Sequence, residues 1–86
     1  MKRIEYAERL LRGWSAPKKR RNKMVLLAWM QAEGNSARCN PLNTTQKTEH
    51  STPLAGNTAG VQEYPTMQEG IGATVKTRFA FSATSL

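Results

Sequence analysis

A short apolar run that leads into a charged residue is the feature that most constrains this chain. Residues 24–30 read MVLLAWM, the most apolar stretch of the sequence, and Glu33 follows shortly after it. At helical spacing, Glu33 shares one face with three large apolar residues of the run, Leu26, Trp29 and Met30. The pattern predicts a buried helix that carries a carboxylate at its end.

Burial beside apolar side chains would raise the pKa of Glu33, and the negative end of the helix would raise it further. A glutamic acid that stays protonated near neutral pH is the proton donor that glycosidic-bond cleavage requires. The alternative is a surface residue at a helix C-terminus, since Gly34 marks a helix end and helix ends are often exposed.

Two helices are predicted in the first part of the chain. The first spans residues 2–12 and is expected to end at Gly13. Its apolar stripe comprises Ile4, Ala7, Leu10, Leu11 and Trp14. The second is expected to begin near Ser15 or Ala16, with Pro17 in its first turn, and to end at Glu33. Its second half is apolar on nearly every side, which predicts a position in the middle of the fold.

The rest of the chain predicts less regular structure. Residues 35–60 are rich in Asn, Thr, Ser, Pro and Gly, which indicates loop or a short hairpin, and residues 61–64 favour a brief extended segment. Thr66 and Glu69 have the spacing of a capping box and predict a third helix. Because Gly70 and Gly72 weaken this helix, we expect it to depend on packing or to allow close approach of another backbone.

The expected fold class is mainly α, with three helices around a buried central helix and an irregular or weakly β middle segment. Leu, Ile, Val and Phe supply only 14 of the 86 residues, so one small domain is the most that such a core can support. We expect that domain over residues 1–78, followed by an unstructured tail at residues 79–86, where neither periodicity nor a cap is found.

The charge balance narrows the classes of partner. Thirteen Lys and Arg residues against six acids give a formal net charge of +7, and all six acids are Glu. A basic run, residues 18–23, begins at Lys18 and ends at Lys23 and indicates binding of nucleic acid or another polyanion, or a solvated helix face. The sequence contains no interleaved aromatics and no recognition module typical of nucleic-acid binding.

The sequence gives no sign of a cofactor, a disulfide or a targeting segment. Cys39 and His50 are the single cysteine and the single histidine, too few for a structural zinc site, and no metal or organic cofactor is implied. The single cysteine excludes an internal disulfide. No apolar stretch approaches the length of a membrane span, and we recognise no signal peptide. The oligomeric state is not indicated.

Two polar features follow the candidate acid. Residues 40–46 carry a dense set of amide and hydroxyl groups, among them Asn40, Asn43 and Thr44. Such groups bind sugars, although ordinary turn chemistry explains them equally well. Tyr64 precedes Pro65 and indicates either a sugar platform or the edge of a core.

Four segments together resemble phage-associated lysozyme-like domains in order and spacing. They are residues 28–34, 37–45, 60–65 and 70–77, and the most specific part pairs AEG at residues 32–34 with NPLNT at residues 40–44. These domains are similar to the glucosaminidase and lytic-transglycosylase types of peptidoglycan hydrolase. The resemblance covers roughly residues 20–78.

The resemblance implies an α+β lysozyme-like fold and cleavage of the glycan strand of peptidoglycan, or binding to it in a degenerate form. It assigns Glu33 as the general acid and places Asn40, Asn43, Thr44 and Tyr64 along the sugar groove. No partner carboxylate is evident, so the second role falls to water or to the substrate's N-acetyl group. A virion-associated protein, or one released at the bacterial cell wall, is implied.

Related domains continue with further helices after the segment that matches residues 70–77. This chain does not, and we therefore expect a shortened form with a half-built groove. Two other classes stay open: a small basic phage or interaction protein that binds polyanions through the basic run, and a virion structural module that keeps the lysozyme shape without its chemistry.

Overall fold

The computed structural model describes residues 2–34 and 36–77, and these residues form a mixed, mainly helical fold. In chain order its elements are α1 (Arg3–Gly13), α2 (Arg20–Glu33), β1 (Thr52–Pro53), β2 (Gln62–Glu63) and α3 (Met67–Lys76). The two strands pair antiparallel, with Thr52 opposite Glu63 and Pro53 opposite Gln62. The coarse fold class expected from the sequence is confirmed.

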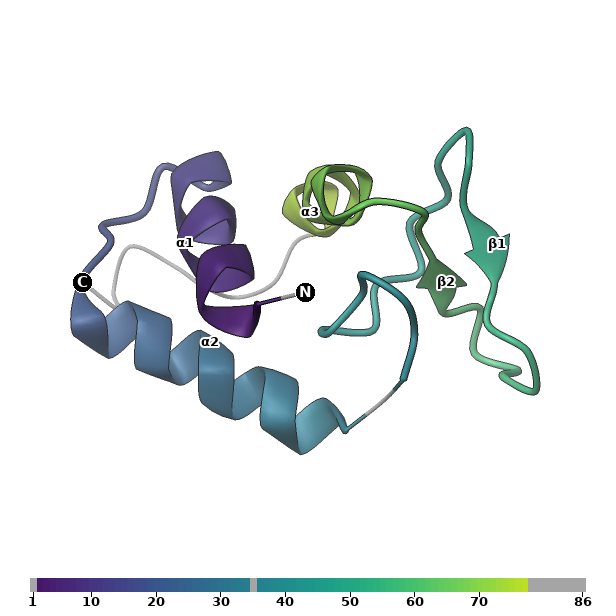
Figure 1. The fold of residues 1–86 in the computed structure, drawn as a ribbon, viewed down its shortest axis with the longest axis horizontal. Helices are drawn as coiled ribbons and strands as arrows, with labels where there is room; N and C mark the ends of the chain where they lie inside the picture. Colours follow the sequence, from purple (N-terminus) through teal and green to yellow (C-terminus); the bar gives the residue numbers. More distant parts are fainter. Residues whose placement is uncertain (1, 35, 78–86) are drawn as a thin grey trace.

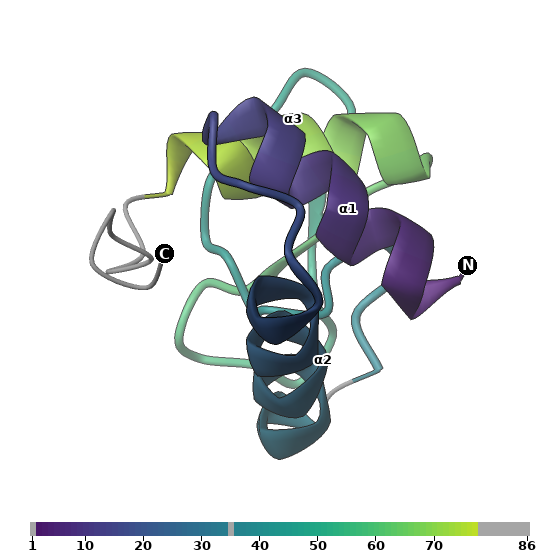
Figure 2. The same ribbon diagram turned by 90° about the vertical axis from the view of Figure 1, so that its left-hand side faces the viewer.

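The helices are arranged in two layers. α1 and α3 lie side by side, and α2 crosses α1 steeply on one side of that pair (Figures 1 and 2). The hairpin lies at the far end of the molecule, next to α3 and away from α1 (Figure 1). The single-domain expectation for residues 1–78 stays a prediction, and the predicted tail at residues 79–86 lies outside the described residues.

α1 forms as its apolar stripe predicts. Ala7, Leu10 and Leu11 are fully buried, whereas Ile4 remains 43% exposed. Tyr6, which the stripe did not include, is also fully buried. Four residues of this helix therefore supply more than half of the buried cluster at the centre of the fold, which is completed by Leu26, Met30 and Leu42.

α2 starts later than predicted. Ser15 has a φ of 54°, and the Ala16 N–H donates to the carbonyl of Leu11 over 2.8 Å, so these residues close α1 instead of capping α2. The buried Asn22 side chain donates to the Pro17 carbonyl over 2.9 Å and holds the connection before the helix begins at Arg20. The predicted end at Glu33 is confirmed, because Gly34 takes the left-handed conformation there.

The expectation that α2 is buried in the middle of the fold is wrong. Its buried residues are Asn22, Leu26 and Met30, which repeat every fourth position and form one face. Met24 and Val25 are 52% and 45% exposed. α2 packs against α1 through the first face, and the described residues leave its opposite face in solvent.

α3 begins with the predicted cap. The Thr66 hydroxyl accepts the Glu69 N–H over 3.1 Å. The Glu69 side chain does not complete the capping box, because it binds Thr48 and His50 in the loop before β1.

Gly70 is where α3 meets another backbone closely. A Cβ added at Gly70 would lie 2.0 Å from the Cys39 carbonyl oxygen, whereas one added at Gly72 would meet nothing within 4 Å. The expected close approach is therefore confirmed at Gly70 and absent at Gly72. The same contact is fastened by Tyr6, whose hydroxyl donates to the Cys39 carbonyl over 3.1 Å and lies 3.0 Å from the Thr74 hydroxyl.

The two helical glycines allow a matched test of this packing. We expect Gly70→Ala to lower the free energy of unfolding by at least about 2 kcal/mol, because backbone at Cys39 must move. Gly72→Ala should raise it by up to about 1 kcal/mol, since alanine favours helix and the position is open. Urea unfolding of the two variants measures both, and equal stabilities would contradict the close approach of α3 to the loop.

Candidate functional site

Glu33 is the last residue of α2, and its side chain is exposed. The prediction that it is buried on the apolar face is wrong. The helix ends at this residue, so its carboxylate reaches water and avoids the large cost of burying a charge. One polar neighbour holds it: the Asn43 amide donates to Glu33 Oε1 over 2.6 Å. The predicted acid and the predicted polar loop therefore do meet.

Asn40 holds the loop that presents Asn43. It is fully buried, and its Nδ2 donates to the carbonyls of Thr44 and Gln62 over 2.9 and 2.6 Å. Its Oδ1 accepts the Thr44 N–H over 2.9 Å. These bonds tie residues 40–44 to β2. Asn43 has a φ of 60°, a conformation that asparagine tolerates better than most residues, and it lies half-buried.

Thr44 and Tyr64 are also buried, although Tyr64 forms part of the lining of a small cavity described below. The Thr44 hydroxyl pairs with that of Thr77 and accepts the Gln46 N–H over 3.2 Å. The Tyr64 hydroxyl donates to the Gln46 carbonyl over 2.5 Å. Of the five predicted site residues, the structure brings only Glu33 and Asn43 together at the surface. The other three hold the loop in place.

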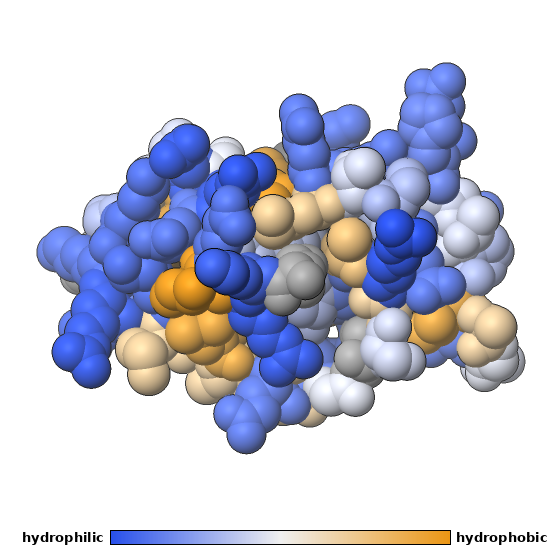
Figure 3. Space-filling view, in the orientation of Figure 1, coloured by the Kyte–Doolittle hydropathy of each residue, from blue (hydrophilic) through white to orange (hydrophobic). Residues whose placement is uncertain are grey.

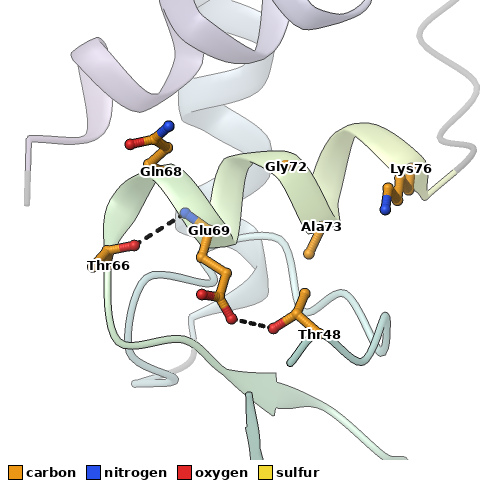
Figure 4. Close-up of a pocket in the computed structure, with 7 residues that line it drawn as sticks. All are labelled: Thr48, Thr66, Gln68, Glu69, Gly72, Ala73 and Lys76. Atoms are coloured by element: carbon orange, nitrogen blue, oxygen red, sulfur yellow. Dashed lines mark hydrogen bonds between the residues drawn. The ribbon is translucent and has the colours of Figure 1, made fainter. Parts of the chain in front are cut away.

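A cavity of about 460 Å³ lies on α3, and none of the five predicted site residues lines it. Gly72 and Ala73 lie between Glu69 and Lys76 on the helix, and Glu69 points toward Thr48 (Figure 4). The lining is completed by Thr66 and Gln68.

The Glu69 carboxylate at this cavity is already engaged by the chain itself. One of its oxygens accepts hydrogen bonds from the Thr48 hydroxyl and, over 3.2 Å, from the His50 backbone N–H. The other oxygen lies 3.1 Å from His50 Nδ1. The hydrogen bond from Thr48, and then those from His50, lower the pKa of Glu69. Its role is to fasten residues 48–50 to α3. The sequence identified Glu69 only as a helix cap, because a partner nineteen or more positions away leaves no local signal.

A second cavity, of about 230 Å³, lies between the hairpin and the start of α3. It is lined by Arg38, His50, Thr52, Glu63, Tyr64 and Pro65. The Glu63 carboxylate there accepts the Arg38 N–H over 3.0 Å. Neither of these two cavities includes Glu33 or Asn43. The Glu33–Asn43 pair therefore lies on open surface apart from both.

Residues 2–34 and 36–77 contain neither a candidate metal-ion cluster nor a candidate membrane-spanning helix. Within that part of the chain no cluster of three or more His, Cys, Asp or Glu residues is placed to hold a metal ion. None of the helices described there has the length and apolar character needed to cross a membrane.

Comparison of the chain with protein-family models, with curated proteins and with solved structures gives no match.

Alkaline titration tests whether Tyr64 is buried or faces a groove. The chain has two tyrosines, and burial raises the pKa of Tyr64 to about 12 and that of Tyr6 further above its ordinary value of 10.0. We expect the folded protein to show no phenolate absorbance near pH 10, because both hydroxyls stay neutral there. An exposed Tyr64 would instead be about half ionised near pH 10 and would give about half of one tyrosine's phenolate signal.

The same shifts set the direction of the pH dependence of stability. Above pH 10 the unfolded chain loses its phenolic protons while the folded chain keeps them, so the free energy of unfolding falls as pH rises. The slope should reach about 1.4 kcal/mol per pH unit for each tyrosine. The contribution of Tyr64 levels off once the pH passes about 12. Tyr64→Phe should remove its share of this slope.

Proposed function

We propose that this chain is a lysozyme-like module that acts on the glycan strand of peptidoglycan, with Glu33 as its general acid. The observation that carries the proposal is the contact between Glu33 and Asn43. It joins the two segments, AEG and NPLNT, on which the resemblance to lysozyme-like domains depends most. The mainly helical fold with a small hairpin after the acid is compatible with that class.

Because Glu33 is exposed, a sugar seated over the Glu33–Asn43 pair would meet its carboxyl group directly. As the general acid of this proposal, Glu33 protonates the leaving glycosidic oxygen. Asn43 supports this step, because its amide fixes one carboxyl oxygen and leaves the other free to face the substrate.

Binding of the sugar rests on the same small surface. The end of α2 and Asn43 supply that surface, and the buried Asn40 keeps the loop around Asn43 in place. Water or the substrate's own N-acetyl group supplies the second role of the reaction. The same surface also supports the degenerate form of the proposal, in which the protein binds the glycan without cutting it.

Glu33→Gln tests the acid assignment, with Glu49→Gln as the matched control at another exposed glutamate. We expect Glu33→Gln to lower the release of soluble glycan fragments from purified peptidoglycan by about 100-fold or more. Its sedimentation with the wall should be nearly unchanged, because the amide keeps the shape of the side chain. Glu49→Gln should behave as the unchanged protein.

Each other outcome of this experiment has a definite meaning. Cleavage by Glu33→Gln at the original rate would remove Glu33 as the acid. Sedimentation of the unchanged protein with peptidoglycan, without any cleavage, would establish the binding form. Failure of both cleavage and sedimentation would overturn the proposed function.

A second candidate function is binding of nucleic acid or another polyanion through residues 18–23. The observation that favours it is that Lys18, Lys19, Arg20 and Arg21 are all exposed. The first turn of α2 contains no acidic residue to offset them. Like charges gathered on one surface attract a polyanion.

Salt dependence separates the two candidates. If four phosphates are neutralised, affinity for a DNA duplex should fall by about 100-fold between about 50 and 200 mM salt. Sugar binding through neutral hydrogen bonds should change little over the same range. An affinity for DNA that is independent of salt would contradict the polyanion function.

A further inference from the structure

The outward face of α2 combines two kinds of side chain. Arg20 and Arg21 begin it, and Met24, Val25 and Ala28 follow at helical spacing, all of them exposed. Met24 and Val25 are two of the three large hydrophobic residues that are exposed within the described part of the chain. Figure 3 shows hydrophobic and strongly hydrophilic atoms next to each other over this part of the molecule. We call these five residues the outer face of α2.

Packing among residues 2–34 and 36–77 does not account for this outer face. The core uses the opposite side of α2, where Leu26 and Met30 pack into the buried cluster. A single exposed apolar residue is ordinary, but here two large ones are adjacent and a third apolar position follows one turn later. In a chain with so few large apolar residues, their exposure points to a surface that has another use.

The charges around the outer face are not cancelled by the acids of the neighbouring helix. Glu5 of α1 pairs with Arg9 over 2.9 Å, and Glu8 pairs with Lys23 over 3.4 Å. Glu5 and Glu8 also line one surface depression with Lys18, so the charge of Lys18 is partly offset. Three exposed cations remain beside the apolar positions: Lys19, Arg20 and Arg21.

The kind of side chain beside the cations distinguishes the possible partners. Single-stranded nucleic acid is held by cations together with aromatic platforms on which bases stack. The outer face presents aliphatic side chains instead. An anionic lipid surface offers both complements at once, since its headgroups are negative and its acyl chains lie just beneath them.

We propose that the outer face of α2 docks on an anionic lipid surface. The helix lies in the plane of the interface, the cations contact headgroups, and Met24 and Val25 enter the boundary of the acyl chains. This proposal rests on the second candidate function, polyanion binding through residues 18–23, and names the polyanion as a lipid surface. Glu33, thirteen residues after Arg20, lies about 20 Å along the helix, so the glycan-facing end is separate from the first turn.

The charge contribution is tested by co-sedimentation with vesicles of equal parts phosphatidylglycerol and phosphatidylcholine, compared with pure phosphatidylcholine. We expect binding to the first and little to the second. Arg20→Glu with Arg21→Glu should weaken binding at least about tenfold. The matched control changes two other exposed cations, Lys2→Glu with Lys47→Glu, which alters net charge equally and should cost less than about threefold.

The apolar contribution is tested by Met24→Ser with Val25→Ser. Both side chains are about half exposed, so the fold should persist, and circular dichroism checks this. We expect this variant to bind the anionic vesicles about tenfold more weakly. Its binding to a random-sequence DNA duplex should be unchanged, because DNA offers no acyl layer.

The outcomes separate this proposal from the function on which it rests. Salt-dependent binding to DNA without binding to vesicles would overturn the lipid proposal and leave the second candidate function standing. Binding to neither would overturn both. Vesicle binding that Met24→Ser with Val25→Ser leaves unchanged would overturn docking of the apolar positions. A dimer in sedimentation equilibrium that this variant abolishes, without vesicle binding, would assign the outer face to a second copy of the chain and overturn the proposal.

Discussion

The buried Tyr6 hydroxyl is the interaction on which the rest of the structure depends. It lies in α1, donates to the carbonyl of Cys39, and is hydrogen-bonded to Thr74 of α3. Three segments that are distant in the chain thus meet at one oxygen atom. Gly70 makes the meeting possible, because its missing side chain lets α3 approach the Cys39 carbonyl directly. A second long-range hydrogen bond, from the Trp14 indole to the Val75 carbonyl over 3.0 Å, joins the C-terminal ends of α1 and α3.

The candidate site inherits its geometry from this junction. Cys39 immediately precedes Asn40, whose side chain binds the loop to β2, and the loop in turn presents Asn43 to Glu33. The carboxylate is therefore positioned by a chain of contacts that begins in the core, although it is itself exposed. Buried amides with all their partners satisfied are rigid elements, and this explains how a surface pair can be held on a small domain.

Local signals in the sequence predicted what local physics decides. The stripe of α1, the Thr66 cap and the end of α2 at Gly34 each depend on neighbours within one turn. The start of α2 was predicted wrongly because Ser15 satisfies the end of the preceding helix, and a small polar residue can serve either end. The prediction of burial in α2 was wrong for a different reason. Val25 belongs to the apolar run and Glu33 follows it, and only the packing of distant segments decides which face of a helix is covered.

The same reasoning explains why polar residues were the hardest to assign. Asn40 and Tyr64 have the chemistry of a sugar-binding surface and were predicted to line one, yet the structure uses them as internal fasteners. An amide or a phenol serves both roles equally well, and sequence spacing does not report which side of the chain meets water. Asn40 binds backbone groups of its own loop and of β2, whereas Asn43, with a φ of 60°, binds the exposed Glu33.

The two faces of α2 serve different purposes: one stabilises the core, and the other is the surface that we propose binds a partner. Its inner face supplies Leu26 and Met30 to a core that has few other large residues. Its outer face leaves Met24 and Val25 about half exposed, although burying the rest of either side chain would stabilise the fold by about 1 kcal/mol. A marginal domain gains most from burying such side chains, so leaving them exposed is a stability cost that selection tolerates most readily when the surface serves another purpose. Because the two faces share no residue, changes to the outer face can alter binding while the core keeps its packing.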